Sequence, residues 1–235
     1  MNTCVFDQLC NREEIEKILD LRIRDLTLYQ EALLHKSAVK IYDAQRSNER
    51  LEFIGDSVLN LIIARYLYDK YPDENEGFMT KLRTRLVSGQ CLCEIARLMD
   101  LHNHIRMNEK ALKQGWNSNN RILEDVFEAL VGAVYLDLGL QMATVYVHDK
   151  LNKYVKFDDL LTDTNYKDIL MRHTQTTNLE LPSYIIKSEH GPNHDKQFVV
   201  NVYINNHLVG EGVAKNKKKA EQLAAKNALN CLGVV

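Results

Sequence analysis

The sequence has 235 residues, of which 45% are hydrophobic and 26% are charged. This composition is typical of globular proteins and leaves room for one large or two small domains. The five scattered cysteines argue against a disulfide framework and for a reducing compartment. We recognise neither an apolar run as long as a membrane span nor a secretory leader, so we expect a cytoplasmic protein without a membrane partner.

Charge is distributed unevenly along the chain. The formal net charge is -2, which by itself does not indicate a nucleic-acid partner. Residues 1–155 carry 20 Lys and Arg against 23 Asp and Glu, whereas residues 165–235 carry 9 against 6. A slightly basic C-terminal part therefore follows an acidic body, and this asymmetry suggests separate tasks for the two parts.

The first 155 residues carry apolar side chains at helical spacing. The expected helical segments are 13–43, with a distinct helix at 26–38, then 48–71, 76–101, 121–139 and 141–154. We expect an irregular loop at 102–120, and Asn119 or Asn120 is placed to cap the helix that follows. No strand pattern precedes residue 155. The sequence therefore predicts an all-α N-terminal domain over residues 1–155.

The pattern changes after an acidic stretch rich in turn formers, which we assign as a linker at residues 156–164. A helix is expected at 166–177, and three segments then alternate apolar with polar residues as strands do. These segments are 182–189, 196–205 and 207–215, and a final helix is expected at 217–232. The order α-β-β-β-α predicts a small α+β domain with an antiparallel sheet over residues 165–235.

Two of the expected helices carry carboxylates that folding does not require. Residues 48–59 (NERLEFIGDSVL) and 122–137 (ILEDVFEALVGAVYLD) place them at spacings that share one helix face: Glu49, Glu52 and Asp56, and then Asp125 and Glu128. Clustered carboxylates need a cation, because burial and repulsion otherwise favour protonation. Oxygen ligands suit Mg²⁺ or Mn²⁺, ions that serve phosphoryl-transfer chemistry. The alternative is that these acids are ordinary charges on exposed helix faces.

These motifs resemble the ribonuclease III family. NERLEFIGDSVL is similar, nearly residue for residue, to the family's sequence hallmark. ILEDVFEALVGAVYLD resembles its second acidic helix, and DENEGFMTKLR (residues 73–83) resembles the acidic-then-basic segment between them. The α-β-β-β-α tail is similar to the double-stranded-RNA-binding domain of the simplest class. The resemblance covers essentially the whole chain in the family's order.

The resemblance implies an endoribonuclease that hydrolyses both strands of double-stranded RNA and leaves 5′-phosphate and 3′-hydroxyl ends with a short 3′ overhang. It implies that Glu52, Asp56, Asp125 and Glu128 bind Mg²⁺, for which Mn²⁺ substitutes. Asp56 and Glu128 would be the catalytic residues, and water would be the nucleophile. The competing interpretation is a non-catalytic protein that sequesters duplex RNA, and the intact set of four carboxylates favours the enzyme.

The resemblance also implies supporting residues and a dimer. Glu49 and Glu76 match further family acids near the cleavage centre and the dimer contact, where structural roles are as consistent as metal binding. Family members work as homodimers through the catalytic domain, and the apolar residues 51–54 match the segment that mediates this pairing. A basic strip on residues 81–85 is open to two interpretations, an RNA contact or a solvated helix face.

The last expected helix begins with a phosphate-binding pattern. Asn216 is a capping residue, and Lys217, Lys218 and Lys219 follow it directly. Cations at a helix N-terminus suit phosphate groups, through their charge and the free backbone N–H groups together. The pattern resembles the family's KKxA phosphate clamp, so Lys217 and Lys218 are the expected RNA contacts.

Two further segments of the tail bear on RNA recognition. GPNHD (residues 191–195) resembles the loop that enters a minor groove, and His194, in a pattern completed by Phe198, is its expected contact. Where bacterial members often carry a Gln-Glu pair on the first helix, this chain has Met171 and Arg172. Arg172 can still meet a phosphate, so we expect duplex binding with little sequence preference. A protein-interaction module is a third interpretation, against which the lysines and His194 argue.

Overall fold

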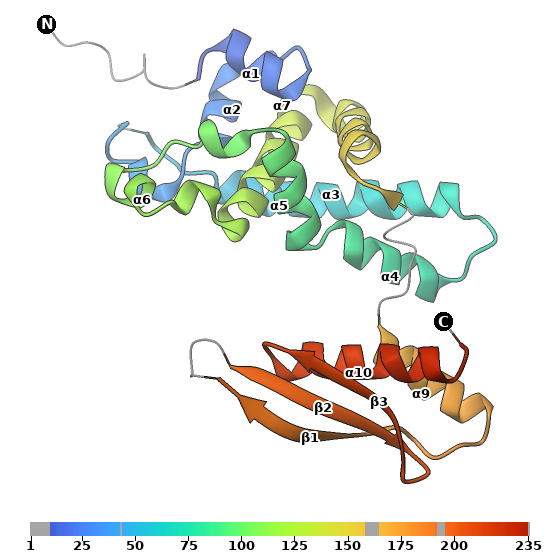
Figure 1. Cartoon of the computed structure of the whole chain (residues 1–235). Helices are drawn as coiled ribbons and strands as arrows, with labels where there is room; N and C mark the ends of the chain where they lie inside the picture. Colours follow the sequence, from blue (N-terminus) through green and yellow to red (C-terminus); the bar gives the residue numbers. More distant parts are fainter. Residues whose placement is uncertain (1–9, 43, 158–164, 192–195, 235) are drawn as a thin grey trace, which may run out of the picture. The chain divides into compact units, whose positions relative to one another are not determined.

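The computed structural model describes residues 10–42, 44–157, 165–191 and 196–234 (Figure 1). The chain divides into two compact units, residues 1–161 and 162–235, and each is described by itself. The predicted fold class is confirmed, because the first unit is helical and the second has the order α-β-β-β-α. The predicted linker lies largely outside the described residues, so its extent stays a prediction.

The first unit is built from seven α-helices within its described residues. They are α1 (Arg12–Leu19), α2 (Leu26–Ala32), α3 (Glu49–Lys70), α4 (Glu76–Leu86), α5 (Gly89–Leu98), α6 (Glu109–Lys113) and α7 (Asn120–Tyr154). The predicted irregular loop at 102–120 contains α6 and two short 3-10 helices, so that prediction was wrong. The side chain of Asn108 caps α6 by accepting the N–H of Ala111 at 2.8 Å. An element this short has too few residues to show a helical period.

Helix α7 is the centre of the first unit, where it packs against α2, α3 and α5 (Figure 1). Its apolar side chains lie in one core cluster with those of its neighbours, among them Leu59 and Ile63 of α3 and Leu92 of α5. The two helices predicted at 121–139 and 141–154 are confirmed as the two parts of α7, which a break at Gly139 separates. Gly139 at the junction has φ 84°, a conformation open to glycine, so the helix is interrupted there.

By length and composition, α7 could also cross a membrane. The expectation that no apolar run reaches that length was therefore wrong. In this structure 44% of the most apolar window of α7 is buried within the protein. Because α7 packs against three other helices and carries the buried Glu128, it serves as the core helix of the unit.

The apolar segment predicted to mediate pairing, residues 51–54, does not lie on one surface. Leu51 is buried, with 3% of its surface exposed, and Ile54 packs partly buried against the core. Phe53 is the exception, because 78% of its surface is exposed. Only Phe53 of this segment is therefore available to a partner, since the helical twist turns its apolar neighbours into the core.

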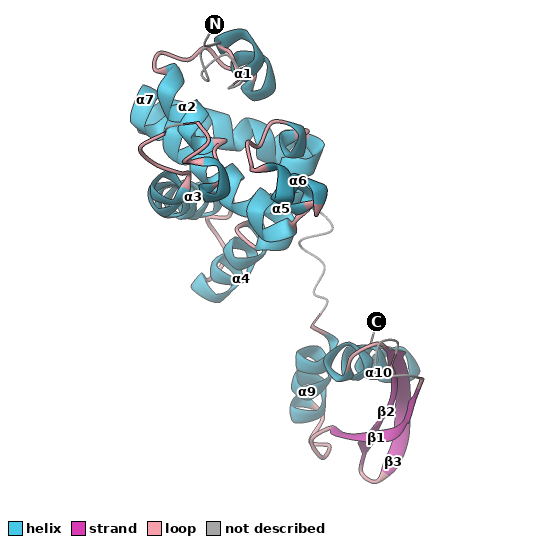
Figure 2. Ribbon diagram, turned by 90° about the vertical axis from the view of Figure 1, so that its left-hand side faces the viewer, coloured by secondary structure: helices cyan, strands magenta, loops and turns pink. Residues whose placement is uncertain are grey.

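The second unit is a three-stranded antiparallel sheet with two helices (Figure 2). Its elements are α9 (Tyr166–Thr176), β1 (Ser183–His190), β2 (Gln197–Ile204), β3 (His207–Ala214) and α10 (Lys217–Cys231). The predicted turn between β2 and β3 is confirmed, and both Asn205 and Asn206 have positive φ there. Gly210 and Gly212 let β3 approach the backbone of α10, where a Cβ would come within 2.4 Å of a carbonyl oxygen.

Candidate active site

Two glycines let α3 and α7 cross with their backbones in contact. A Cβ on Gly55 would lie 1.8 Å from the carbonyl oxygen of Glu128, and one on Gly132 would lie 2.3 Å from that of Leu51. Since real atoms do not approach so closely, a larger residue would drive the helices apart. The crossing therefore fixes the acidic faces of the two helices next to each other.

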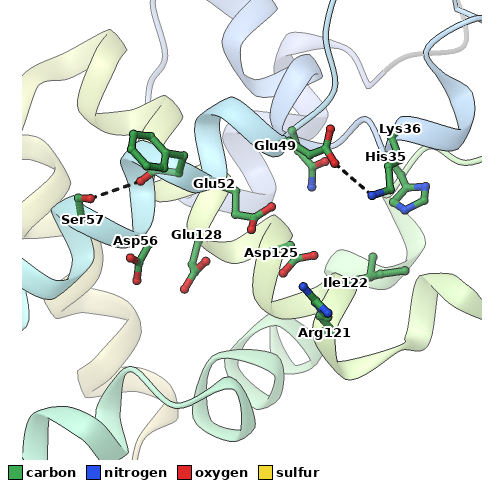
Figure 3. Close-up of a pocket in the computed structure, with 12 residues that line it drawn as sticks. His35, Lys36, Glu49, Glu52, Asp56, Ser57, Arg121, Ile122, Asp125 and Glu128 are labelled. Carbon is green, nitrogen blue, oxygen red and sulfur yellow. Dashed lines mark hydrogen bonds and ion pairs between the residues drawn. The ribbon is translucent and has the colours of Figure 1, made fainter.

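A cleft of about 710 Å³ opens beside this crossing. The four acids that the sequence predicts as metal ligands all line it (Figure 3): Glu52 and Asp56 from α3, and Asp125 and Glu128 from α7. Three of them, Glu52, Asp125 and Glu128, also line a second cleft of about 940 Å³. Acids about seventy residues apart in sequence are thus brought into one place, and each pair shares one face of its helix as its spacing predicts.

Burial and repulsion disturb the titration of this cluster. The pKa of Glu128, which is only 9% exposed, is raised to about 8 by burial and then by the surrounding carboxylates, Asp56 first. Burial also raises the pKa of Glu52, to which Asp125 adds, and burial raises the pKa of Asp125 itself. Carboxylates arranged in this way are stabilised by a bound cation, and such perturbed groups are typical of functional sites.

The two predicted supporting acids are placed differently. Glu49 lines the first cleft, but its Oε1 lies 3.1 Å from the Nζ of Lys36, and the Oγ of Ser47 donates to its Oε2 at 3.0 Å. The hydrogen bond from Lys36 is the main cause that lowers the pKa of Glu49, so this charge is already compensated. Glu76 begins α4, accepts a hydrogen bond from Thr80 at 2.7 Å, and lines neither cleft.

Three residues of the site were missed in the sequence. Glu124 and Gly89 both line the second cleft. A Cβ added to Gly89 would lie 2.3 Å from the carboxylate of Glu124. Asn60 donates its Nδ2 hydrogen to Oδ1 of Asp56 at 2.8 Å and so orients that carboxylate. Arg121 lines both clefts. Asn60 and Arg121 each stand four residues from a predicted ligand, which is the spacing that could have found them.

The donor set of the cleft fits a hard divalent cation. Among the described residues, no three His, Cys, Asp or Glu side chains converge closely enough to hold an ion as they stand. Repulsion between carboxylates favours such a spread arrangement. The oxygen donors of Glu52, Asp56, Asp125 and Glu128 nevertheless face the same cleft, and oxygen ligands suit Mg²⁺ or Mn²⁺.

The predicted phosphate-binding lysines begin α10. Asn216 caps the helix as predicted, because its side chain accepts the N–H of Lys219 at 2.8 Å. Lys217, Lys218 and Lys219 are all exposed. The Nζ of Lys217 lies 3.5 Å from a carboxylate oxygen of Glu189 and 5.4 Å from the ring centre of Phe198.

The other predicted RNA contacts have separate outcomes. Arg172 is exposed on α9 and forms an ion pair with Asp168 one turn earlier, at 2.8 Å. His194 and most of its loop lie outside the described residues, so its contact stays a prediction. Phe198 lies on β2 and packs partly buried against the core of the second unit.

Comparison with known proteins agrees with both units. Residues 25–155 match the family model described as Ribonuclease-III-like, and residues 166–232 match the one described as Double-stranded RNA binding motif. The chain belongs to the ribonuclease III family. The predicted family is thereby confirmed, and with it the enzyme class. The family consists of divalent-metal-dependent endoribonucleases that act on double-stranded RNA, and this chain carries both of the domains concerned.

The relatives that the chain resembles match most of its length. Ribonuclease 3 of Symbiobacterium thermophilum is 40% identical over 212 residues, which are 90% of each chain. Protein A464R of Paramecium bursaria Chlorella virus 1 is 44% identical over 223 residues, 95% of this chain and 80% of that protein. The solved nuclease domain of ribonuclease III from Campylobacter jejuni is 34% identical with a TM-score of 0.58, and covers 62% of this chain and 99% of that domain.

The raised pKa of Glu128 predicts a pH-dependent stability of the ion-free protein. The group titrates near 8 when folded but near its ordinary value of 4.5 when unfolded. Below the unfolded pKa, the titration of Glu128 does not change the unfolding free energy. As the pH rises from there to the folded pKa, the unfolding free energy falls by at most about 1.4 kcal/mol per pH unit. We expect the melting temperature in chelator to drop by about 5 °C between about pH 5.5 and about pH 8.

The control for this melting experiment is Glu128→Gln, which removes the titrating group and keeps the shape of the side chain. The fall with pH should be smaller in this variant, and Mg²⁺ should restore the unsubstituted protein at the higher pH. Identical slopes in the two proteins would show that Glu128 titrates normally and would contradict the assigned electrostatics.

Proposed function

We propose that this chain hydrolyses both strands of double-stranded RNA with Mg²⁺ and leaves 5′-phosphate and 3′-hydroxyl ends with a short 3′ overhang. The observation that carries the proposal is the placement of four carboxylates in one cleft of a chain that also has a double-stranded-RNA-binding motif. The rival is a non-catalytic duplex-binding protein. Such a protein has no use for the cluster, whose carboxylates repel each other and destabilise the fold.

The four carboxylates would hold the ion, and Asp56 and Glu128 are the assigned catalytic residues. When bound, Mg²⁺ or its substitute Mn²⁺ lowers the pKa of water and stabilises charge on the phosphate. Asn60 holds one oxygen of Asp56. Glu128 is the most buried acid of the cleft, next to the glycine contact between α3 and α7. Rigid helices on both sides keep these donors in place, which a precise ion site requires.

Duplex binding is assigned to the second unit. Lys217 and Lys218 would neutralise phosphates of the RNA backbone, and Arg172 would add a third cation from α9. His194 would contact 2′-hydroxyl groups in a minor groove. Contacts of these kinds read the shape of a duplex, so little sequence preference is expected. Glu49 and Glu76 are assigned supporting roles, because the first is paired with Lys36 and the second lines neither cleft.

We assign the active form as a homodimer through the catalytic domain. Phe53 supports this assignment, since a phenylalanine with 78% of its surface in water is costly unless a partner covers it. Leu61 and Tyr68 are also exposed on the same helix, α3. In a dimer each subunit would cut one strand.

The proposed function is tested by incubating the chain with long duplex RNA, with and without Mg²⁺, and mapping the lengths and ends of the products. We expect short duplexes with 5′-phosphates and 3′ overhangs in Mg²⁺, intact RNA in chelator, and no cutting of a single strand of the same sequence. Binding of the duplex without any cutting in Mg²⁺ or Mn²⁺ would favour the non-catalytic protein.

Replacing Lys217 and Lys218 together by alanine should weaken duplex binding. Each lysine that neutralises a phosphate contributes about one unit to the slope of log affinity against log salt, so the slope should fall by about 2. The measurement is a binding titration at several salt concentrations. Lys187→Ala is the control, because Lys187 is an exposed β1 lysine paired with Glu211 at 2.7 Å. An unchanged slope in the double variant would count against the clamp.

A further inference from the structure

Arg121 stands where the two clefts of the catalytic domain meet. It lines both of them, and it lies in the first turn of α7, one turn before Asp125. Figure 3 shows its side chain directly beside Asp125. The residue is exposed, so its guanidinium is accessible to a molecule that enters either cleft.

The first cleft is rich in negative charge, which a cation such as Arg121 would partly neutralise. Five carboxylates face the first cleft: Glu49, Glu52, Asp56, Asp125 and Glu128. Lys36 compensates Glu49, but the other four repel the phosphates of an RNA strand, and a resident divalent ion would offset only part of their charge. A protein cation within the cleft would therefore favour binding of a phosphodiester at the cluster.

The other basic side chains of the clefts are already engaged. Lys36 is paired with Glu49 at 3.1 Å, and burial lowers the pKa of His35, which disfavours a positive charge on its ring. In the second cleft, Arg97 donates one hydrogen bond to the carbonyl oxygen of Ser118 at 3.1 Å and another to the side chain of Asn120.

Arg121 differs from these residues. Within the part of the chain that the structure describes, its guanidinium forms no hydrogen bond or ion pair, and only its backbone N–H is used, in the cap with Asn119. A guanidinium offers five donors in a planar fork that matches two phosphate oxygens at once. Among the described basic residues of the two clefts, Arg121 therefore has guanidinium N–H groups that are available to a phosphate.

We propose that Arg121 is a further catalytic residue, which binds a non-bridging oxygen of the phosphodiester that is cut. This inference rests on the proposed function. The guanidinium holds the phosphate against the carboxylate cluster and stabilises the negative charge that grows on its oxygens during hydrolysis. No bond to Arg121 forms or breaks, and no proton leaves it.

A purely electrostatic role within the resting protein is the rival. Burial raises the pKa of Asp125 and of Glu52, and Arg121 offsets part of that rise, so it could serve only to reduce repulsion before the ion binds. Under that rival, loss of Arg121 would change the Mg²⁺ concentration needed for activity but not the rate at saturating Mg²⁺. The contact with substrate predicts the opposite, a loss of rate that additional Mg²⁺ does not recover.

The test compares Arg121→Gln, Arg121→Lys and the unsubstituted chain in cleavage of long duplex RNA across a Mg²⁺ titration. We expect kcat at saturating Mg²⁺ to fall about 30-fold in Arg121→Gln, with a Mg²⁺ midpoint that is unchanged or lower, and Arg121→Lys to recover part of the loss. Arg22→Gln is the matched control, because it removes the same charge from a side chain that is 94% exposed and lines neither cleft.

Three results would overturn the inference. Arg121→Gln could reach the unsubstituted kcat once Mg²⁺ is raised, or Arg22→Gln could lose as much activity. A melting temperature that falls in both Arg121 variants together with their rates would assign the residue a structural role instead. Failure of the unsubstituted chain to cut duplex RNA would reject the proposed function itself, whereas normal cutting by Arg121→Gln beside an active unsubstituted chain rejects only the role of Arg121.

Discussion

Glu128→Gln is expected to reduce cleavage of duplex RNA in Mg²⁺ by about 1000-fold or more, while duplex binding stays within about twofold. Glu128 is the most buried of the four carboxylates and faces both clefts, so its oxygens are central to any ion held there. Glutamine keeps the volume and one oxygen but removes the charge that an ion requires. The measurements are single-turnover cleavage and a binding titration on the same duplex.

Binding has a separate basis, because the lysines assigned to RNA lie on α10 of the other unit. A variant that loses both activities has therefore lost its fold rather than its ion. Glu109→Gln is the matched control in the same domain, since it makes the same substitution at a side chain that is 88% exposed and lines neither cleft. Undiminished cutting by Glu128→Gln would contradict the assignment of the ion site.

Gly55→Ala should be almost as damaging, although it adds only one methyl group. The new Cβ would lie 1.8 Å from the carbonyl oxygen of Glu128 and 2.9 Å from the backbone N of Gly132. Displacing the backbone of a packed core helix costs free energy. We therefore expect the unfolding free energy of the catalytic domain to fall by about 3 kcal/mol or more. The separation of α3 from α7 should also abolish cleavage at temperatures where the domain stays folded.

The matched control is Gly77→Ala in the first turn of α4. A Cβ there would contact only the side chain of Asn75, at 3.3 Å, and alanine favours helix. Thermal melts and cleavage rates of the two variants provide the comparison. Equal melting temperatures and cleavage rates in Gly55→Ala and Gly77→Ala would contradict the close backbone contact between α3 and α7.

The sequence predicted the site largely through helical spacing. Glu52 and Asp56, and likewise Asp125 and Glu128, are recognisable because acids at intervals of three and four interrupt apolar helices. Nothing in that spacing indicates how the two helices meet. Their contact depends on Gly55 and Gly132, which have no side chains to reveal it and matter only through the partner backbone.

Other features required the three-dimensional structure. Leu51, Phe53 and Ile54 are similar residues in one motif, yet only Phe53 is exposed, because the direction of each side chain depends on the packing of α3. Glu124 appears in the sequence as an ordinary helix charge, and only the packing of α7 against α5 places it in the second cleft. Helix α6 was missed because five residues carry no usable period.

The central claim is that four carboxylates at the α3–α7 crossing hold the divalent ion of the enzyme. Anomalous diffraction from crystals of the protein grown with Mn²⁺ tests it most directly. The account predicts an anomalous peak between the carboxylates of Glu52, Asp56, Asp125 and Glu128. An ordered cleft without a peak there, or Mn²⁺ bound at another set of residues alone, would contradict it.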